Sequence, residues 1–249
     1  GTDTPLQQKS HDHMCVADLK GKPGLWGGAG GGIPPLPKGM GYTLYGPFFC
    51  PDSVYSKNTS YGMVNSTDGY NADPGPGTAE AFFSALFAGQ LASGVPLTGY
   101  EVDFLQDQTT WFEYMVTEHD GAANWLSGMA NAAASHNVSV QYCMAHPGAF
   151  LHALSLPAVT NGRASVDYQT PSGNLLTYGT AAPFFAAVGI APSKDNFWST
   201  PRQPRPRDLR PSTGGPPPCD GGSRNVTNTF LHALVATLST GPVGFSDAV

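Results

Sequence analysis

Short strand-like runs alternate with longer helix-like stripes along most of this chain. The strand-like runs are rich in β-branched and aromatic residues and follow turn-forming Gly, Pro or Asn. They are Tyr42–Tyr45, Gly99–Leu105, Val138–Met144 and Pro242–Phe245. The helix-like stripes repeat apolar residues every three or four positions, over residues 78–91, 125–133 and 230–238. This alternation predicts a series of β-α units.

Capping signals locate the start of two expected helices. Thr78 is expected to cap the first helix. The apolar face of that helix is expected to consist of Phe82, Phe83, Leu86, Phe87 and Leu91. The sequence Thr110-Trp-Phe-Glu113 has the form of a capping box, so a second helix is expected to begin there.

The spacing of strands and helices is typical of parallel β-α units. A doubly wound sheet and a closed barrel both have this rhythm. A doubly wound nucleotide-binding sheet places a Gly-rich phosphate turn after its first strand, whereas Gly27–Gly32 follows no strand-like run. The sequence therefore favours an α/β fold of the (β/α)8 TIM-barrel type, present as an incomplete or processed segment with long Gly/Pro-rich loops.

Composition divides the chain into a lead-in and one domain. Residues 1–40 are an irregular Gly/Pro-rich lead-in without periodicity, and residues 41–249 hold the barrel-type, catalytic-like domain. Within that domain, residues 201–222 form a Pro-rich loop.

Charge and hydropathy exclude two classes of partner. Only 12% of the 249 residues are charged and the net charge is −6, which gives no basic surface for nucleic acid. No apolar run approaches the roughly 18 residues of a membrane span. The opening Gly1-Thr2-Asp3 lacks the basic-then-apolar start of a signal peptide, so we expect a processed or partial chain.

Sequons and cysteines both indicate a secreted, extracellular glycoprotein. Four Asn-x-Ser/Thr sequons are present, at Asn58, Asn65, Asn137 and Asn225. Four cysteines are candidates for disulfides in any of three pairings, and no unpaired thiol is expected among Cys15, Cys50, Cys143 and Cys219. A cytosolic protein with unused sequons is the alternative.

Two acidic residues stand where strands of a barrel would end. Asp103 lies near the end of Gly99–Leu105, and an acid in so apolar a run is costly to bury unless it is hydrogen-bonded or functional. Strand alternation places Glu101 and Asp103 on one face. Asp167 follows Arg163 by four residues, and the guanidinium could fix its carboxylate. Reactive groups of TIM barrels lie at the carboxyl ends of strands, so Asp103 and Asp167 are expected to face each other there.

Three motifs occur in a fixed order. They are Tyr100-Glu-Val-Asp103 followed by Gln106, Arg163-x-Ser-x-Asp167, and Ser239-Thr-Gly-Pro-Val-Gly-Phe-Ser-Asp247. Over residues 78–249 the chain thereby resembles the glycoside hydrolase clan of α-galactosidases and raffinose or stachyose synthases. The resemblance implies that Asp103 is the nucleophile, that Asp167 is the acid/base, and that Arg163 is a substrate or carboxylate partner.

The resemblance also points to further residues of a sugar site. Gln141–Met144 resembles the fifth strand of the family, whose end lines the site, and His146 follows it. Asp247 ends a motif that resembles the eighth strand. Trp111 and Trp198 are candidates to pack on a pyranose ring.

Two departures from the family pattern bear on activity. Glu101 occupies the position where the family often has a Lys that binds sugar hydroxyls, and a second carboxylate there would weaken the nucleophile. The paired acids of the family's first strand are not identifiable in residues 1–40.

The sequence thus predicts a carbohydrate-active enzyme that works by double displacement through two aspartates. The alternative is a non-catalytic extracellular glycoprotein that keeps the barrel as a scaffold or sugar-binding surface, with partners among cell-wall or other extracellular glycoproteins. A serine hydrolase is disfavoured because no Gly-x-Ser-x-Gly elbow is present. No zinc-ligand spacing is complete, so we expect no metal and no cofactor.

Overall fold

The computed structural model describes residues 15–16, 38–46, 48–51, 53–57, 59–66, 72–166, 173–195, 197–201 and 228–244. The chain divides into two compact units, Gly1–Thr160 and Asn161–Val249. The order of the strands in the larger sheet is β2-β6-β7-β8-β9, and the division falls inside β8 (Val159–Arg163).

Parallel strands form the centre of the first unit. β2 (Tyr42–Gly46) pairs with β6 (Leu97–Val102), and β6 pairs with β7 (Ser139–Tyr142). In register, Tyr45 stands opposite Glu101, and Glu101 stands opposite Gln141. Because the strands are parallel, their carboxyl ends lie at the same edge of the sheet. The strands predicted at 42–45, 99–105 and 138–144 are therefore confirmed, with ends that differ by a few residues.

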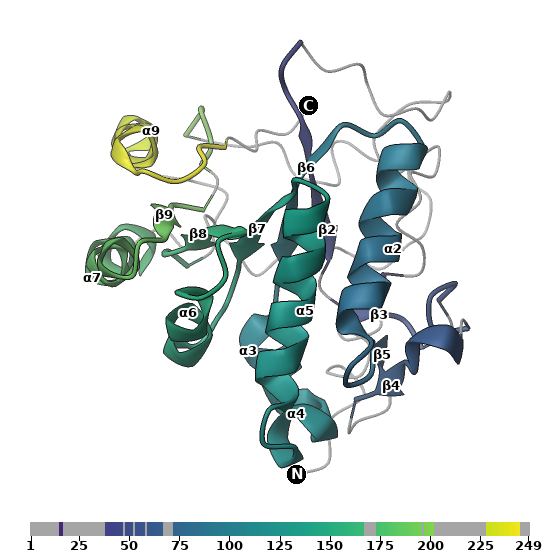
Figure 1. Ribbon diagram of the computed structural model, residues 1–249. Helices are drawn as coiled ribbons and strands as arrows, with labels where there is room; N and C mark the ends of the chain where they lie inside the picture. Colours follow the sequence, from purple (N-terminus) through teal and green to yellow (C-terminus); the bar gives the residue numbers. More distant parts are fainter. Residues whose placement is uncertain are drawn as a thin grey trace, which may run out of the picture. The chain divides into compact units, whose positions relative to one another are not determined.

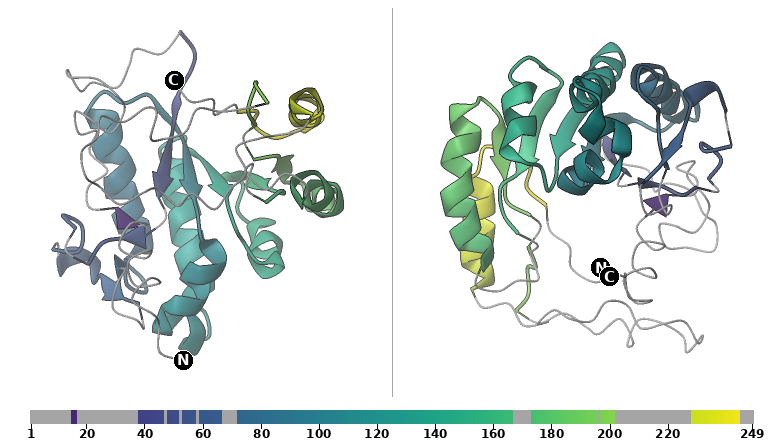
Figure 2. Two further views of the ribbon diagram at one scale, coloured as in Figure 1. Left: turned by 180° about the vertical axis from the view of Figure 1, so that it is seen from behind. Right: turned by 90° about the horizontal axis from the view of Figure 1, so that it is seen from below.

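Two helices cover one face of this sheet. α2 (Ala79–Ala92) and α5 (Gly121–Ser135) pack against each other and run beside β6 and β7 (Figures 1 and 2). Aromatic rings fill the space beneath them, with Tyr100 of β6 5.6 Å from Phe83 and 5.4 Å from Phe87 between ring centroids. Phe83 in turn contacts Trp125 of α5 at 5.9 Å. Leu91, expected on the buried face of α2, is exposed instead.

Alternation along β6 and β7 separates an apolar face from a polar one. Tyr100, Val102 and Val140 are buried beneath the helices, whereas Glu101 and Gln141 are only half-buried. This pattern allows one face of the sheet to build the core and leaves the other face to carry polar side chains.

A second, smaller sheet packs beside this core. Its strands are β1 (Cys15–Val16), β3 (Phe48–Phe49), β5 (Ala72–Asp73) and β4 (Val64–Asn65), in that order, with a 3-10 helix η1 (Thr59–Tyr61) between β3 and β4 along the chain. Asp73 is 2% exposed, and it accepts hydrogen bonds from the Tyr114 hydroxyl at 3.3 Å and from Trp125 Nε1 at 3.2 Å. Burial raises the pKa of this carboxyl well above its ordinary value.

The region after β6 does not follow the predicted capping box. Thr110 lies inside α3 (Leu105–Trp111), and its hydroxyl donates back to the carbonyl of Gln106 at 3.1 Å. α4 (Glu113–Thr117) begins three residues later, after Phe112, without a side-chain cap. The capping-box prediction is wrong because α3 already starts at Leu105, directly after the turn that ends β6.

A further helix of the first unit, α6 (Pro147–Ala153), follows β7.

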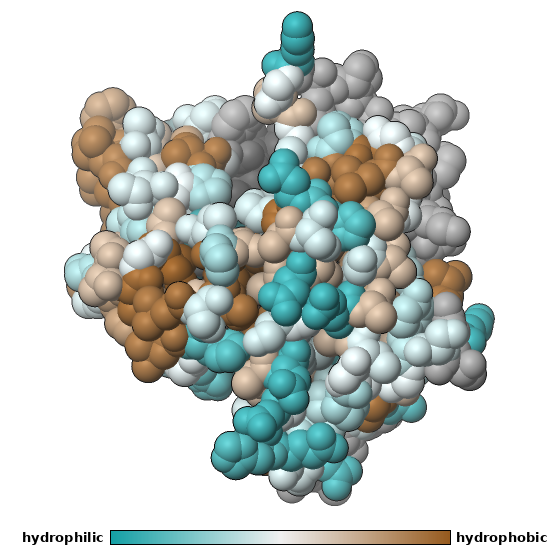
Figure 3. Space-filling model, in the orientation of Figure 1, coloured by the Kyte–Doolittle hydropathy of each residue, from teal (hydrophilic) through white to brown (hydrophobic). Residues whose placement is uncertain are grey.

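The described part of the second unit contains two parallel strands and two helices. β8 pairs with β9 (Ala191–Ser193), and α7 (Gly173–Ala187) lies between them in sequence. α9 (Thr229–Leu238) confirms the helix predicted at 230–238, but its apolar side chains face outward: Phe230 is 79% exposed and Leu238 is 74% exposed. Brown atoms mark this apolar surface at the position of α9 in Figure 3.

The strand predicted over Pro242–Phe245 is not formed in its described part, since residues 242–244 have no strand conformation. Gly244 instead accepts one hydrogen bond from the Phe197 amide at 3.3 Å. The described residues thus form a mixed α/β structure with a parallel sheet, which confirms the α/β class. No helix among them is long and apolar enough to cross a membrane.

Candidate functional site

Asp103 lies at the carboxyl end of β6, where a sharp turn stops the strand. Phe104 adopts the left-handed backbone conformation, with φ of 52°, which a bulky residue enters only at some cost in free energy. Met144 makes the matching turn after β7, with φ of 51°. The two turns are joined by a hydrogen bond from the Gln106 amide to the Met144 carbonyl at 2.8 Å.

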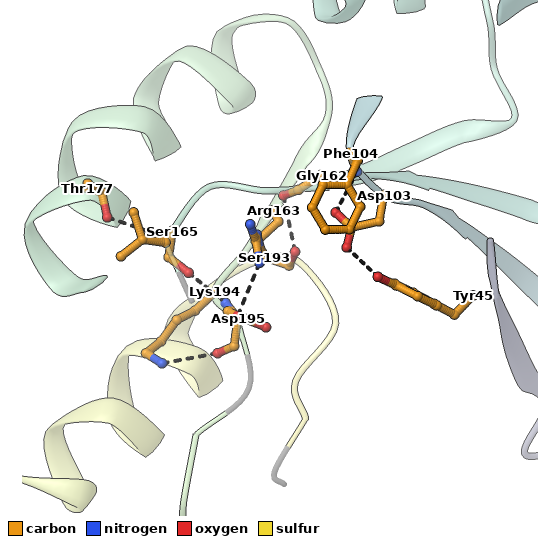
Figure 4. A network of polar contacts seen from close by, with 11 residues as sticks. Tyr45, Asp103, Phe104, Gly162, Arg163, Ser165, Thr177, Ser193, Lys194 and Asp195 are labelled. Carbon is orange, nitrogen blue, oxygen red and sulfur yellow. Dashed lines mark hydrogen bonds and ion pairs between the residues drawn. The ribbon is translucent and has the colours of Figure 1, made fainter. Parts of the chain in front are cut away.

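Asp103 is 8% exposed, and its carboxylate is held by two donors. Its Oδ2 accepts the Tyr45 hydroxyl at 2.6 Å, and its Oδ1 accepts the Phe104 amide at 2.8 Å (Figure 4). Gln108, on the first turns of α3, donates to the Asp103 carbonyl at 2.6 Å. Charge-assisted hydrogen bonds of this kind fix the orientation of a carboxylate.

Tyr45 is bound to Asp103 in its protonated form. Burial of the hydroxyl, the hydrogen bond to Asp103, and the negative charges of Asp103 and Glu101 together raise the pKa of Tyr45 far above its ordinary value. The hydroxyl therefore remains a donor throughout the neutral and moderately alkaline range. The sequence pattern predicts Tyr45 only as a strand residue, and the register of β2 and β6 places it opposite Glu101.

Glu101 and Gln141 are neighbours of this pair on the polar face. Glu101 lies between Tyr45 and Gln141 in the register of the three strands. The negative charge of Glu101 contributes to the raised pKa of Tyr45. This edge of the first unit therefore combines two carboxyl groups, a phenol and an amide.

Aromatic rings stack on one another next to the turn that follows Asp103. Phe48 is stacked with Phe104 at 5.8 Å and with Trp111 at 5.3 Å between ring centroids. Trp111 is partly exposed. Trp111 is thus linked to Phe104 through the ring of Phe48, and its predicted packing on a pyranose ring stays a prediction.

Arg163 ends β8 in the second unit and contacts a different acid from the one predicted. Its Nη1 is 3.4 Å from Asp195 Oδ2, and the Asp195 amide donates a hydrogen bond to Ser165 Oγ at 2.8 Å (Figure 4). Asp167, the predicted partner of Arg163, lies outside the described residues. Asp195 was not among the predicted site residues, although it lies three residues before the predicted Trp198.

Lys194 and His232 are two further buried polar groups of the second unit. Each is 3% exposed, and Lys194 Nζ donates to the Asp195 carbonyl at 3.1 Å. Burial lowers the pKa of Lys194 to about 8, partly offset by the charge of Asp195. Burial and the nearby Lys194 charge lower the pKa of His232.

The remaining predicted site residues fall into three groups. Trp198 is buried at 6% exposure, whereas His146 is exposed at the start of α6. Asn65 and Asn137 are exposed, as a glycosylation site requires. Asp247, Asn58 and Asn225 lie outside the described residues.

The cysteines correct one expectation. Cys50 is disulfide-bonded, whereas Cys143 is a reduced cysteine with 1% exposure. The expectation that every cysteine is in a disulfide is therefore wrong for Cys143, because this side chain is enclosed in the core directly after β7. The side chain of Cys15 and the whole of Cys219 are outside what the structure describes.

Metal-binding side chains do not cluster in the part of the chain that the structure describes: no group of three or more His, Cys, Asp or Glu residues there could hold a metal ion. Comparison of the chain with protein-family profiles, with curated proteins and with solved structures gives no match.

Proposed function

We propose that this protein is a retaining glycosidase or transglycosidase of the α-galactosidase type, with Asp103 as its nucleophile. The observation that supports this most strongly is the setting of Asp103. Its carboxylate lies at the carboxyl end of a parallel strand and is oriented by Tyr45 and by the Phe104 amide. A fixed, nearly buried carboxylate at that edge suits nucleophilic attack on a sugar.

The reaction proceeds in two displacements. Asp103 attacks the anomeric carbon and forms a glycosyl ester, while Asp167 gives its proton to the oxygen of the leaving group. Asp167 then removes a proton from water, or from a sugar hydroxyl in a transfer reaction. The activated oxygen attacks the anomeric carbon and releases Asp103 as a carboxylate. Asp167 enters this mechanism through the family resemblance alone.

The parallel strands belong, in this proposal, to part of a (β/α)8 barrel. The helices α2 and α5 cover the apolar face of β6 and β7, as the outer helices of a barrel do. The polar face with Tyr45, Glu101 and Gln141 would then face the barrel interior. Secretion and glycosylation are part of the same proposal, since Asn65 and Asn137 are exposed sequons.

Glu101 favours a second candidate, a sugar-binding scaffold without turnover. Its carboxylate acts on the same phenol as Asp103 does, and it stands where the family often has a Lys that binds sugar hydroxyls. A scaffold would bind galactosides and leave them unchanged.

Turnover of aryl α-galactosides by single variants distinguishes these candidates. Asp103→Asn should lower kcat/KM by about a thousandfold or more for every leaving group, because no ester can form. Asp167→Asn should spare substrates with good leaving groups, which need little protonation. Asp120→Asn, at an exposed carboxyl, is the control and should behave as the wild type. Equal losses for good and poor leaving groups in Asp167→Asn would contradict its acid/base role.

A further inference from the structure

The helix α9 has a narrow buried face. In this helix of 10 residues the buried positions are His232 and Ala236, whereas Phe230 is 79% exposed and Leu238 is 74% exposed. The imidazole of His232 is therefore the largest side chain that α9 buries. A helix held by so little apolar area is stabilised weakly by burial, so the charge of that imidazole matters for its docking.

The end of α9 is fixed against β9 and α7. The Gly241 amide donates to the Pro192 carbonyl at 3.1 Å, and a Cβ at Gly241 would lie 2.6 Å from that carbonyl oxygen. The backbones therefore approach so closely that only glycine fits. A hydrogen bond also joins Tyr178 of α7 to Ser239, which follows the last turn of α9.

Lys194 is buried against the same helix. It directly follows β9, is 3% exposed, and extends on the side of α9 in Figure 4. Its Nζ donates to the Asp195 carbonyl at 3.1 Å. Burial lowers the pKa of Lys194 to about 8, so the amine is mainly charged at neutral pH. Burial first, and the charge of Lys194 second, lower the pKa of His232.

Charged and titratable groups on the neighbouring elements complete these surroundings. After β9, Asp195 offsets part of the effect of burial on Lys194, and its carboxylate is 3.4 Å from Nη1 of Arg163, which ends β8. On α7, Tyr178 keeps its proton because burial raises its pKa. Histidine is the side chain that ordinarily changes charge between pH 5 and 8. His232 is therefore the group at this contact whose charge responds to mild acid.

We infer that α9 is an acid-sensitive element, docked on β9 through neutral His232 and released when His232 gains a proton beside Lys194. Two positive charges enclosed together repel each other and lose their hydration. In the released helix the imidazole is hydrated and away from Lys194, so it binds a proton near its ordinary pKa of 6.5. Docking is therefore strongest above pH 6.5 and weakens as the pH falls below that value. This inference does not depend on the proposed function.

Hydrogen–deuterium exchange of the whole protein, corrected for the intrinsic exchange rate at each pH, measures the docking of α9. Between pH 7.5 and pH 5.5 the protection of residues 229–238 should fall by about threefold to tenfold, since each pH unit below the ordinary value favours protonation of the released helix by at most about tenfold. The helix α5 of the first unit should keep its protection. A fall in α9 no larger than that in α5 would overturn the inference.

Variants assign the effect to His232. His232→Gln keeps a neutral polar side chain that gains no proton, so the fall in protection should disappear. His119→Gln, at a histidine whose side chain is 97% exposed, is the matched control and should retain the fall. A fall of wild-type size in His232→Gln would overturn the inference.

Lys194→Met tests the pair from its other side. It removes the neighbouring charge, so the fall in the protection of α9 should be smaller than in the wild type. If His232→Gln leaves α9 unprotected even at pH 7.5, Lys194→Met decides instead. An undiminished fall in Lys194→Met would then overturn the inference.

Discussion

Asp103 and Tyr45 form a short hydrogen bond between two side chains at the end of β6. The phenol donates to the carboxylate at 2.6 Å, and both groups are drawn from neighbouring parallel strands or their ends. The pKa of Tyr45 is raised by its burial and by this contact. The hydroxyl therefore keeps its proton, and donates it to Asp103, in the neutral and moderately alkaline range. A nucleophile that must attack one carbon atom gains from being held in a single orientation.

Removing the Tyr45 hydroxyl tests this contact. Tyr45→Phe keeps the ring and leaves Asp103 with the Phe104 amide as a donor, so the variant should still fold, with a melting temperature lowered by roughly a few degrees. A hydrogen bond to a charged group contributes roughly 1.5–3 kcal/mol, so kcat/KM for an aryl α-galactoside should fall between about tenfold and a hundredfold. Tyr42→Phe makes the same chemical change on the same strand and serves as the control. Similar kcat/KM values in both variants would show that Tyr45 does not orient the nucleophile.

The elements of the first unit are organised around an aromatic core between the sheet and two helices. Asp73 at the end of β5 is the exception, because it is a carboxyl inside that core and accepts hydrogen bonds from α4 and α5. Its raised pKa means that the folded protein binds a proton there more tightly than the unfolded chain does. Stability is therefore lost as pH rises from the ordinary Asp value of 3.8 towards the folded pKa.

Asp73→Asn removes this titration and keeps the shape of the side chain. Its carbonyl can accept from Trp125 and its amide can donate to the Tyr114 oxygen. The variant should match the wild type near pH 4 and exceed its melting temperature by about 3 °C or more at pH 8, since each pKa unit corresponds to about 1.4 kcal/mol. Thermal melts over this range measure the difference. A difference that does not grow with pH would show that Asp73 is ionised in the fold.

Periodicity predicted the elements of this unit better than their ends. The apolar spacing of residues 78–91 and 125–133 was sufficient to place α2 and α5, because those helices bury whole stripes. The left-handed turn at Phe104 and the burial of Asp73 depend on contacts between distant segments, such as Tyr114 with Asp73. No local pattern encodes such contacts. The outward apolar face of α9 was missed for the same reason, since helical spacing does not reveal which neighbour covers a stripe.

At the scale of the whole molecule, the described chain is a mixed α/β protein with exposed sequons at Asn65 and Asn137. Asn137 is in the turn that ends α5 and adopts φ of 56°, a conformation that Asn accepts more readily than most residues. If the protein is secreted, both residues are accessible to glycosylation. Of the two aspartates predicted as the catalytic pair, the structure describes Asp103 and its contacts. Asp167 lies outside the described residues, and its role stays a prediction.

Glycan occupancy tests the secreted assignment. Peptide mass spectrometry of the protein from its native source should find glycan at Asn65 and at Asn137, and enzymatic removal of the glycan should convert each modified Asn to Asp. Native material with both asparagines unmodified would argue for an intracellular protein.

Capture of the covalent intermediate is the most direct measurement of the central claim, that Asp103 is a glycosidic nucleophile. A fluorinated α-galactosyl fluoride reacts with such a nucleophile and leaves a slowly hydrolysed ester. Intact-mass analysis should show one added fluorogalactosyl group per chain, peptide mapping should place it on Asp103, and the Asp103→Asn protein should gain none. Attachment of the group to another residue, or no added mass on a wild-type protein that turns over aryl α-galactosides, would contradict the account.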